Sequence, residues 1–212
     1  MDSEQPVADA NRRPLASRST SWARFFADRL VRLGISPNAI SVASILPAAL
    51  GAYFLVCTPT VGGLLGTALC VQLRLLCNLL DGMVAIEGQR RSPTGVLYNE
   101  IPDRIADSLF IVALGYSIHA IWIGWFGALA AAVTAYIRVL GGSLGFPQDF
   151  RGPMAKPHRM AVLTLGCVLG ALEWRIHGSD WALRAAAWII AVGATVTCGT
   201  RTLAIAHRLQ SK

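Results

Sequence analysis

Long apolar tracts dominate the pattern of hydrophobic and polar positions along the chain. Each tract is about 20 residues long, the length that an α-helix needs to cross the hydrocarbon core of a membrane. Short polar segments separate the tracts, so we expect an all-α polytopic membrane protein. The six predicted transmembrane helices are residues 38–57, 62–86, 102–118, 121–144, 158–176 and 181–206.

The segment before the first span is polar and rich in arginine. Residues 1–20 lack the apolar run of a signal peptide and are predicted to form a disordered cytosolic tail. In residues 21–33, aromatic and leucine side chains alternate with three arginines at helical spacing. This spacing predicts a juxtamembrane amphipathic helix that lies flat on the membrane. The sequence Ser36-Pro37-Asn38 is then typical of the start of a helix.

The composition supports the membrane assignment. Hydrophobic residues make up 54% of the 212 residues and charged residues only 15%, whereas soluble domains carry about 25% charged residues. These values exclude a disordered chain, a disulfide scaffold and an ordinary soluble domain. The net charge of +7 favours a negatively charged membrane face over nucleic acid as the partner, because the cations lie beside apolar tracts.

Lysine and arginine are concentrated in alternate loops. The segments 58–61 and 118–120 carry neither residue, whereas the loops at 87–101 and 145–157 and the tail at 207–212 do. By the positive-inside rule, both termini and these two loops are expected on the cytosolic side.

Acidic and amide side chains at the cytosolic ends of the second and third spans are the best candidates for chemistry, because such groups are costly inside a membrane. They are Asn78 and Asp81 on one span and Asn99, Asp103 and Asp107 on the next. The spacing places each set on one helical face, and consecutive antiparallel spans bring the faces together. Carboxylate and amide oxygens without His or Cys predict a site for one or two Mg²⁺ or Mn²⁺ ions. For each residue taken singly, helix capping or helix packing is the alternative.

A metal ion held there could bind a diphosphate and stabilise charge as a phosphoryl bond breaks. Three small residues, Gly82, Ala85 and Gly95, leave room beside the acidic faces for a bulky ligand.

This stretch resembles the signature of the CDP-alcohol phosphatidyltransferase family, Asp-x2-Asp-Gly-x2-Ala-Arg-x8-Gly-x3-Asp-x3-Asp. The chain carries the same register as Asn78-x2-Asp81-Gly82-x2-Ala85-Ile86-x8-Gly95-x3-Asn99-x3-Asp103. Its departures are the two asparagines and Ile86. They look similar to a bacterial subgroup of the family that has the same asparagines and an Asn-Glu pair like Asn99-Glu100. The Ser36-Pro37-Asn38 sequence and the six spans are also similar to the family.

The resemblance implies that residues 21–206 form a six-helix domain that transfers the phosphatidyl group of CDP-diacylglycerol to a small alcohol and releases CMP. It implies metal ligands at Asn78, Asp81, Asn99 and Asp103, nucleotide contacts at Gly82, Ala85 and Gly95, and catalytic carboxylates at Asp103 and Asp107. Asp103 is the base that the family register favours, and Asp107 would compensate for Asn99. A homodimer in a bacterial inner membrane, active on its cytosolic side in phospholipid synthesis, is implied as well.

Basic side chains near the cytosolic ends of the later spans are candidates for binding the acceptor phosphate or the lipid headgroup. They are Arg138, Arg151, Lys156 and Arg159, and ordinary positive-inside anchoring is the alternative for Arg151 and Lys156. Arg74, seven residues before Asp81, is a candidate partner for an acidic side chain.

A catalytically silent membrane protein that binds nucleotide, lipid or metal is the alternative function. A small transporter ranks third, because broken helices and polar midplane residues are lacking. The acceptor stays open among glycerol 3-phosphate, inositol phosphate, serine and simpler alcohols.

Overall fold

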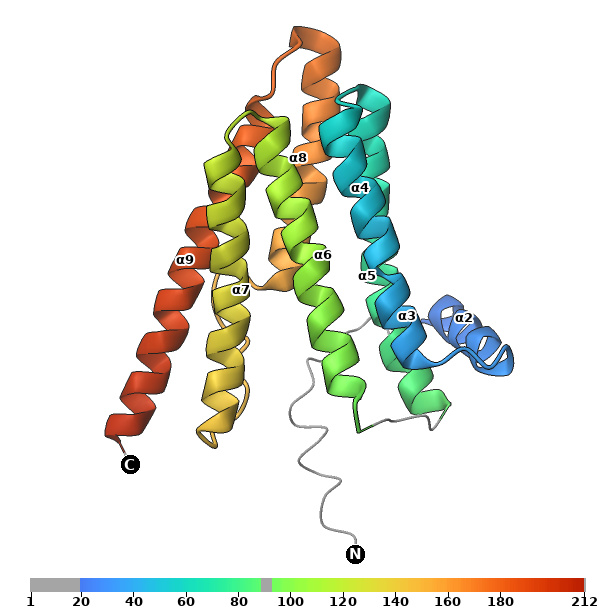
Figure 1. Ribbon diagram of the computed structural model, residues 1–212, viewed down its shortest axis with the longest axis vertical. Helices are drawn as coiled ribbons and strands as arrows, with labels where there is room; N and C mark the ends of the chain where they lie inside the picture. Colours follow the sequence, from blue (N-terminus) through green and yellow to red (C-terminus); the bar gives the residue numbers. More distant parts are fainter. Residues whose placement is uncertain (1–19, 89–92, 212) are drawn as a thin grey trace, which may run out of the picture.

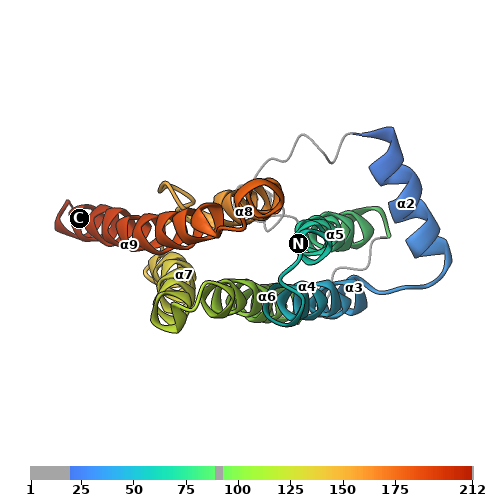
Figure 2. The same cartoon turned by 90° about the horizontal axis from the view of Figure 1, so that it is seen from above.

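The computed structural model describes residues 20–88 and 93–211, and within these ranges the chain forms helices and no strands (Figure 1). The helices are α2 (Ser21–Arg32), α3 (Pro37–Ala43), α4 (Ile45–Cys57), α5 (Val61–Glu87), α6 (Gly95–Ser117), α7 (Ile121–Ser143), α8 (Lys156–His177) and α9 (Trp181–Gln210). The long helices pack as a closed ring in the order α4, α5, α8, α9, α7, α6. Seen from above, α5, α8 and α9 form one row and α4, α6 and α7 the other (Figure 2).

The predicted amphipathic helix is α2, which lies beside the bundle and contacts α5 (Figure 1). Its Ala23 and Ala27 are buried, while Trp22, Phe25 and Phe26 are exposed on its other face. This division is that of a helix with one face on the bundle and an apolar face available to the membrane surface.

The first predicted span consists of α3 and α4, which meet at Ser44. Ser36 caps α3 by accepting a hydrogen bond from the backbone N–H of Ala39 at 3.2 Å, and Pro37 follows at the first helical position. The interruption at Ser44 has a local cause. Pro47 lacks the N–H that would otherwise donate to the carbonyl of Ala43.

Five stretches of the described chain are long and apolar enough to cross a membrane. They are Pro37–Cys57, Val61–Ile86, Ile121–Ser143, Lys156–His177 and Trp181–Gln210. The third predicted span differs: α6 has the same length as α7, 23 residues, but carries too many charged residues for this composition. Those charges are concentrated in its first half, where the site lies.

Two helix boundaries differ from the sequence prediction. α6 begins at Gly95 instead of residue 102, so Asn99 and Glu100 lie on the helix. The helix continues through Pro102, which lacks the N–H that would donate to the carbonyl of Tyr98. α9 continues to Gln210, so most of the predicted tail 207–212 is helical.

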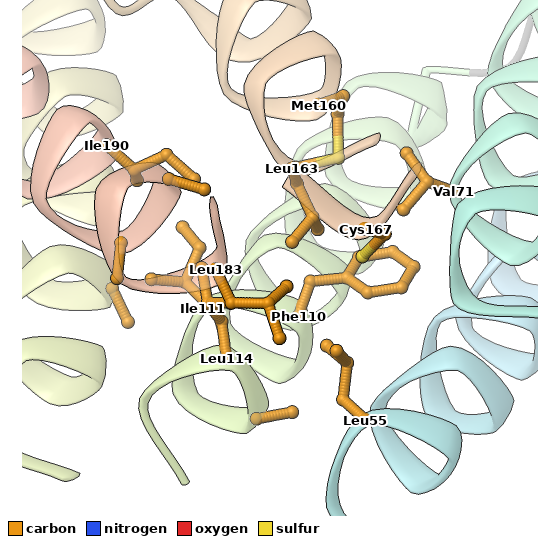
Figure 3. Close-up of a cluster of buried hydrophobic side chains, with 14 of the residues drawn as sticks. Leu55, Val71, Phe110, Ile111, Leu114, Met160, Leu163, Cys167, Leu183 and Ile190 are labelled. Atoms are coloured by element: carbon orange, nitrogen blue, oxygen red, sulfur yellow. The ribbon is translucent and has the colours of Figure 1, made fainter. Parts of the chain in front are cut away.

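The apolar core fills the ring between the charged first half of α6 and the end of the bundle that carries the α8–α9 turn. Phe110, three residues after Asp107, is buried with Met160, Leu163 and Cys167 of α8 (Figure 3). Farther along, a Cβ atom on Gly115 would lie 2.6 Å from Cα of Gly124, so the backbones of α6 and α7 are in direct contact. The core therefore closes one side of the charged site and holds α6 in place.

Candidate active site

The two predicted acidic faces meet inside the ring. Asp81 of α5 and Asp103 and Asp107 of α6 are all buried. Nδ2 of Asn78 donates to Oδ1 of Asp103 at 3.1 Å, which joins the two faces directly. The convergence expected from antiparallel spans is confirmed.

Asp103 is surrounded by cations of the chain itself. Nη2 of Arg74, on α5, donates to its Oδ1 at 2.7 Å, and the side chain of Arg74 is 0% exposed. Nζ of Lys156, at the start of α8, forms an ion pair with Oδ2. The predicted acidic partner of Arg74 is thus Asp103. Lys156 therefore lies in the site. A lysine that only anchored the protein to the membrane face would lie outside it.

Asp107 lies one turn further along α6 and has a different partner. Nη2 of Arg159, on α8, donates to its Oδ2 at 2.7 Å, and the two side chains are 1% and 3% exposed. Nη2 of Arg74 lies 3.6 Å from its Oδ1. Arg159 also donates to the carbonyl of Met154. The sequence analysis assigned Arg159 to a set of basic residues that could bind a ligand. Because a charge inside a span needs a buried partner, a pair between Arg159 and Asp107 could have been predicted.

Asp81 is held by a residue that the sequence analysis missed. Oγ of Ser41, on α3, donates to its Oδ2 at 2.5 Å, and Ser41 is itself buried. A small hydroxyl near the start of the first predicted span is the only signal for it in the sequence.

The remaining predicted residues lie at the rim. Asn99 is exposed, and within the described chain its side chain makes no hydrogen bond. Gly82 and Ala85 are half-buried on α5. At Gly95 an added Cβ would meet no described atom within 4 Å, so packing does not require glycine there. This open position agrees with the room for a ligand predicted from the small residues.

Arg138 of α7 forms a second polar cluster beside the first. Its Nη2 donates to Oε1 of Glu100 at 2.5 Å and its Nη1 to Oε1 of Gln148 at 2.6 Å. Arg104 connects the clusters, because its Nη2 lies 3.8 Å from both a Glu100 and an Asp103 oxygen. Arg138 therefore lies next to the site, as predicted from its place within a span.

Arg151 does not join the site. Its side chain is 66% exposed and pairs with Asp149, at 2.7 Å. This guanidinium, donating hydrogen bonds to the carboxylate, holds the pKa of Asp149 below its ordinary value. The contacts of Arg151 agree with a role outside the pocket.

Arg201 of α9 is a further residue that the sequence analysis missed. Its guanidinium donates to the carbonyls of Thr134 and Arg151, both at 2.8 Å. Oγ1 of Thr197 accepts from the backbone N–H of Met154 at 2.9 Å. Together these bonds attach the segment before α8 to α7 and α9, and thereby position Lys156.

The donor chemistry of the site fits a hard divalent cation. Asp81 and Asp103 supply carboxylates, Asn78 supplies an amide, and Oδ1 of Asp107 is a buried oxygen without a hydrogen bond. In the described ranges, no three His, Cys, Asp or Glu side chains are grouped closely enough to hold a metal ion. The chain's own cations pair with two of these carboxylates, so metal binding requires at least one of the cations to move.

No protein-family model matches the sequence. The chain is 28% identical over 198 residues to a phosphatidylinositol phosphate synthase of Mycobacterium marinum, covering 89% of this chain and 82% of that protein. A phosphatidylinositol phosphate synthase of Streptomyces avermitilis is 27% identical over 188 residues, 85% of this chain and 76% of that protein. A bifunctional IPC transferase and DIPP synthase of Rubrobacter xylanophilus is 38% identical over 144 residues, 65% of this chain but 32% of that protein.

Solved structures show the same fold. Phosphatidylinositol phosphate synthase of Mycobacterium tuberculosis (PgsA1) in complex with manganese and citrate superposes with a TM-score of 0.74 at 22% identity, covering 86% of this chain and 88% of that one. Its form with CDP-DAG bound gives a TM-score of 0.73 at 22% identity, covering 88% and 94%. The named relatives support the prediction of an enzyme of phospholipid synthesis, a CDP-alcohol phosphatidyltransferase.

Proposed function

We propose that the protein transfers the phosphatidyl group of CDP-diacylglycerol to a phosphorylated small alcohol, foremost an inositol phosphate, and releases CMP. The observation that carries this proposal is the contact between the two polar faces, Asn78 of α5 with Asp103 of α6, beside Lys156. Carboxylates of this kind suit a metal-bound diphosphate, and the neighbouring cations suit the phosphate of an acceptor. The names of the curated relatives support this acceptor class.

In the proposed reaction, the acceptor hydroxyl oxygen forms a bond to the phosphorus that carries diacylglycerol. The bond from that phosphorus to the CMP oxygen breaks, CMP leaves, and the hydroxyl proton passes to the carboxylate of Asp103. A divalent cation, when bound, stabilises the negative charge of the diphosphate. Asp81, Asp103 and Asn78 would hold this cation, with Asn99 as a further ligand from the rim. Gly82, Ala85 and Gly95 line the nucleotide, as the family register implies.

Lys156 connects acceptor binding to proton transfer. Its ion pair occupies Oδ2 of Asp103, and its side chain is 21% exposed. An acceptor phosphate attracts Lys156 away from the carboxylate and leaves Oδ2 able to accept the proton. Asp107 keeps its arginine partners throughout, so we assign it the role of positioning α6 and α8.

We infer that α6 also crosses the membrane, although it carries more charged residues than the five apolar stretches. It lies between α4 and α7 and is as long as α7. Asp103 and Asp107 face buried cations, so their charges are not exposed to lipid. We therefore count six spans in a catalytic domain of residues 21–206, placed in a bacterial inner membrane. The end of the bundle that carries α2 and the start of α6 faces the cytosol.

The homodimer implied by the family resemblance belongs to this proposal. An apolar groove of about 590 Å³ on the outer face of α4, α6 and α7 is the candidate contact surface, with Ile105, Tyr116 and Trp125 in its lining. The mass of the detergent-solubilised protein tests the dimer, and a Trp125→Arg change should shift it to the monomer.

The function is tested by CMP release from CDP-diacylglycerol in lipid nanodiscs with Mn²⁺. The acceptors are inositol 1-phosphate, glycerol 3-phosphate, inositol and serine, and the lipid product is identified by mass. We expect release with a phosphorylated acceptor, and a loss of at least about 100-fold in Asp81→Ala. Asp180→Ala, which removes a carboxylate far from the site, is the matched control.

Lys156→Met should raise the KM for the phosphorylated acceptor more than it lowers kcat. Binding of CDP-diacylglycerol without CMP release for any acceptor would refute the enzyme and favour the catalytically silent protein.

A further inference from the structure

Arg74 occupies an unusual position between the two carboxylates of α6. Its Nη2 lies 2.7 Å from Oδ1 of Asp103 and 3.6 Å from Oδ1 of Asp107, two residues one helical turn apart. A cation ligated by both carboxylates would lie in the same place. The Arg74 side chain is fully buried, in contrast to that of Lys156.

Hydrogen bonding alone does not account for this arginine. Nε and Nη1 of Arg74 are buried without a hydrogen-bond partner. Buried donors are normally satisfied, and a guanidinium can make five hydrogen bonds. The main contribution of Arg74 at this position is therefore its positive charge.

The charge balance of the site leads to the same conclusion. Three buried carboxylates, Asp81, Asp103 and Asp107, face two buried arginines, Arg74 and Arg159. The other two ligand positions of the family register are the neutral Asn78 and Asn99. A single negative charge is left over in the buried set, and Lys156 neutralises it in this structure. One divalent cation more than compensates this charge, and a second would lie beside a buried guanidinium.

We propose that Arg74 takes the place of a second divalent cation, so that this site binds one metal ion. The single ion would replace Lys156 as the mobile cation of the site, because Lys156 is 21% exposed and can move toward solvent, whereas Arg74 is fully buried. Asn78 fits this arrangement, since its amide donates to the same Oδ1 that Arg74 contacts. The inference rests on the proposed function for the presence of a metal, but its test does not use turnover.

The experiment counts Mn²⁺ ions bound by the full chain in nanodiscs, by electron paramagnetic resonance of free and bound Mn²⁺. We expect one ion per chain and a six-line spectrum without exchange coupling. Two ions per chain, or the coupled spectrum of ions about 4 Å apart, would overturn the proposal even if CMP is released. No Mn²⁺ binding at millimolar concentration would overturn it as well.

Three variants assign the effect to Arg74. Asn78→Asp alone should still bind one ion, more tightly than the parent, because Arg74 is still present. Arg74→Gln combined with Asn78→Asp should bind two. Arg184→Gln removes a partly exposed arginine near the other end of the bundle and should bind one ion.

If Asn78→Asp alone binds two ions, Arg74 is not what excludes the second, and the proposal fails. Should the double variant not fold, the counts for the parent and for Asn78→Asp still decide the matter. A count of one without CMP release would contradict the proposed function only.

Discussion

Replacing Asp107 by asparagine should destabilise the bundle much more than the same change at a surface ion pair. Asp107 and Arg159 are 2.7 Å apart with side chains 3% and 1% exposed. Asparagine keeps the shape and one acceptor oxygen but leaves the Arg159 charge buried without a counterion. Breaking a buried pair in this way costs about 3–5 kcal/mol. Because the amide can still accept a hydrogen bond, we expect a loss of about 3 kcal/mol.

The chain offers a matched control. Asp180 and Arg184 are 2.8 Å apart, but their side chains are 31% and 40% exposed. Solvent screens such a pair, so Asp180→Asn should cost about 0–1 kcal/mol. The measurement is the free energy of unfolding in mixed micelles with increasing SDS, followed by far-ultraviolet circular dichroism.

The double variant Asp107→Leu with Arg159→Leu separates charge from packing. Removing both charges together should cost less than either single change, because no ion is left unpaired. Mn²⁺ should not restore the stability of Asp107→Asn, since the group left unpaired is the cation of Arg159, which a second cation cannot neutralise. The reasoning is refuted if Asp107→Asn costs no more than Asp180→Asn, or if Mn²⁺ restores it fully.

Three further predictions concern single side chains. Ser41→Ala removes the hydrogen bond that orients the α5 carboxylate and should weaken Mn²⁺ about 10- to 100-fold; an unchanged Mn²⁺ titration would exclude this role. Asn78→Ala should weaken Mn²⁺ more than Asn99→Ala does, because Asn99 is exposed at the rim, and the reverse order would contradict the geometry. Arg151 lowers the pKa of Asp149, so their pair stabilises the fold above the unfolded-state pKa of about 4 and loses this contribution as the pH falls through the lower folded-state value. Asp149→Asn should therefore reduce the free energy of unfolding at neutral pH, and the difference from the parent should shrink in acid; a constant difference would contradict the shift.

Much of the fold follows from local pattern in the sequence. The apolar tracts and the Ser36-Pro37 start predicted the helices, because segment length and a cap depend on neighbouring residues only. The spacing of Asp103 and Asp107 on one face is likewise a property of a single helix. The convergence of α5 and α6 required only that consecutive spans are antiparallel. For the same reason, the candidate site could be located to one end of two helices before any contact was known.

The partners of the charged residues were decided by the tertiary structure. Whether Arg159 binds a ligand or pairs with Asp107 depends on how α8 is rotated against α6. This rotation cannot be predicted from the sequence of either helix alone. The bond from Ser41 to Asp81 depends on how α3 packs on α5, and the exposure of Asn99 on where the ring leaves the start of α6 uncovered. Side-chain periodicity determines which residues share a face of one helix, whereas the packing of the ring determines which faces meet and which charges neutralise each other. Arg74 shows the difference most directly: its position in the sequence marks it as needing a partner, and only the packing of α5 against α6 places it between two carboxylates.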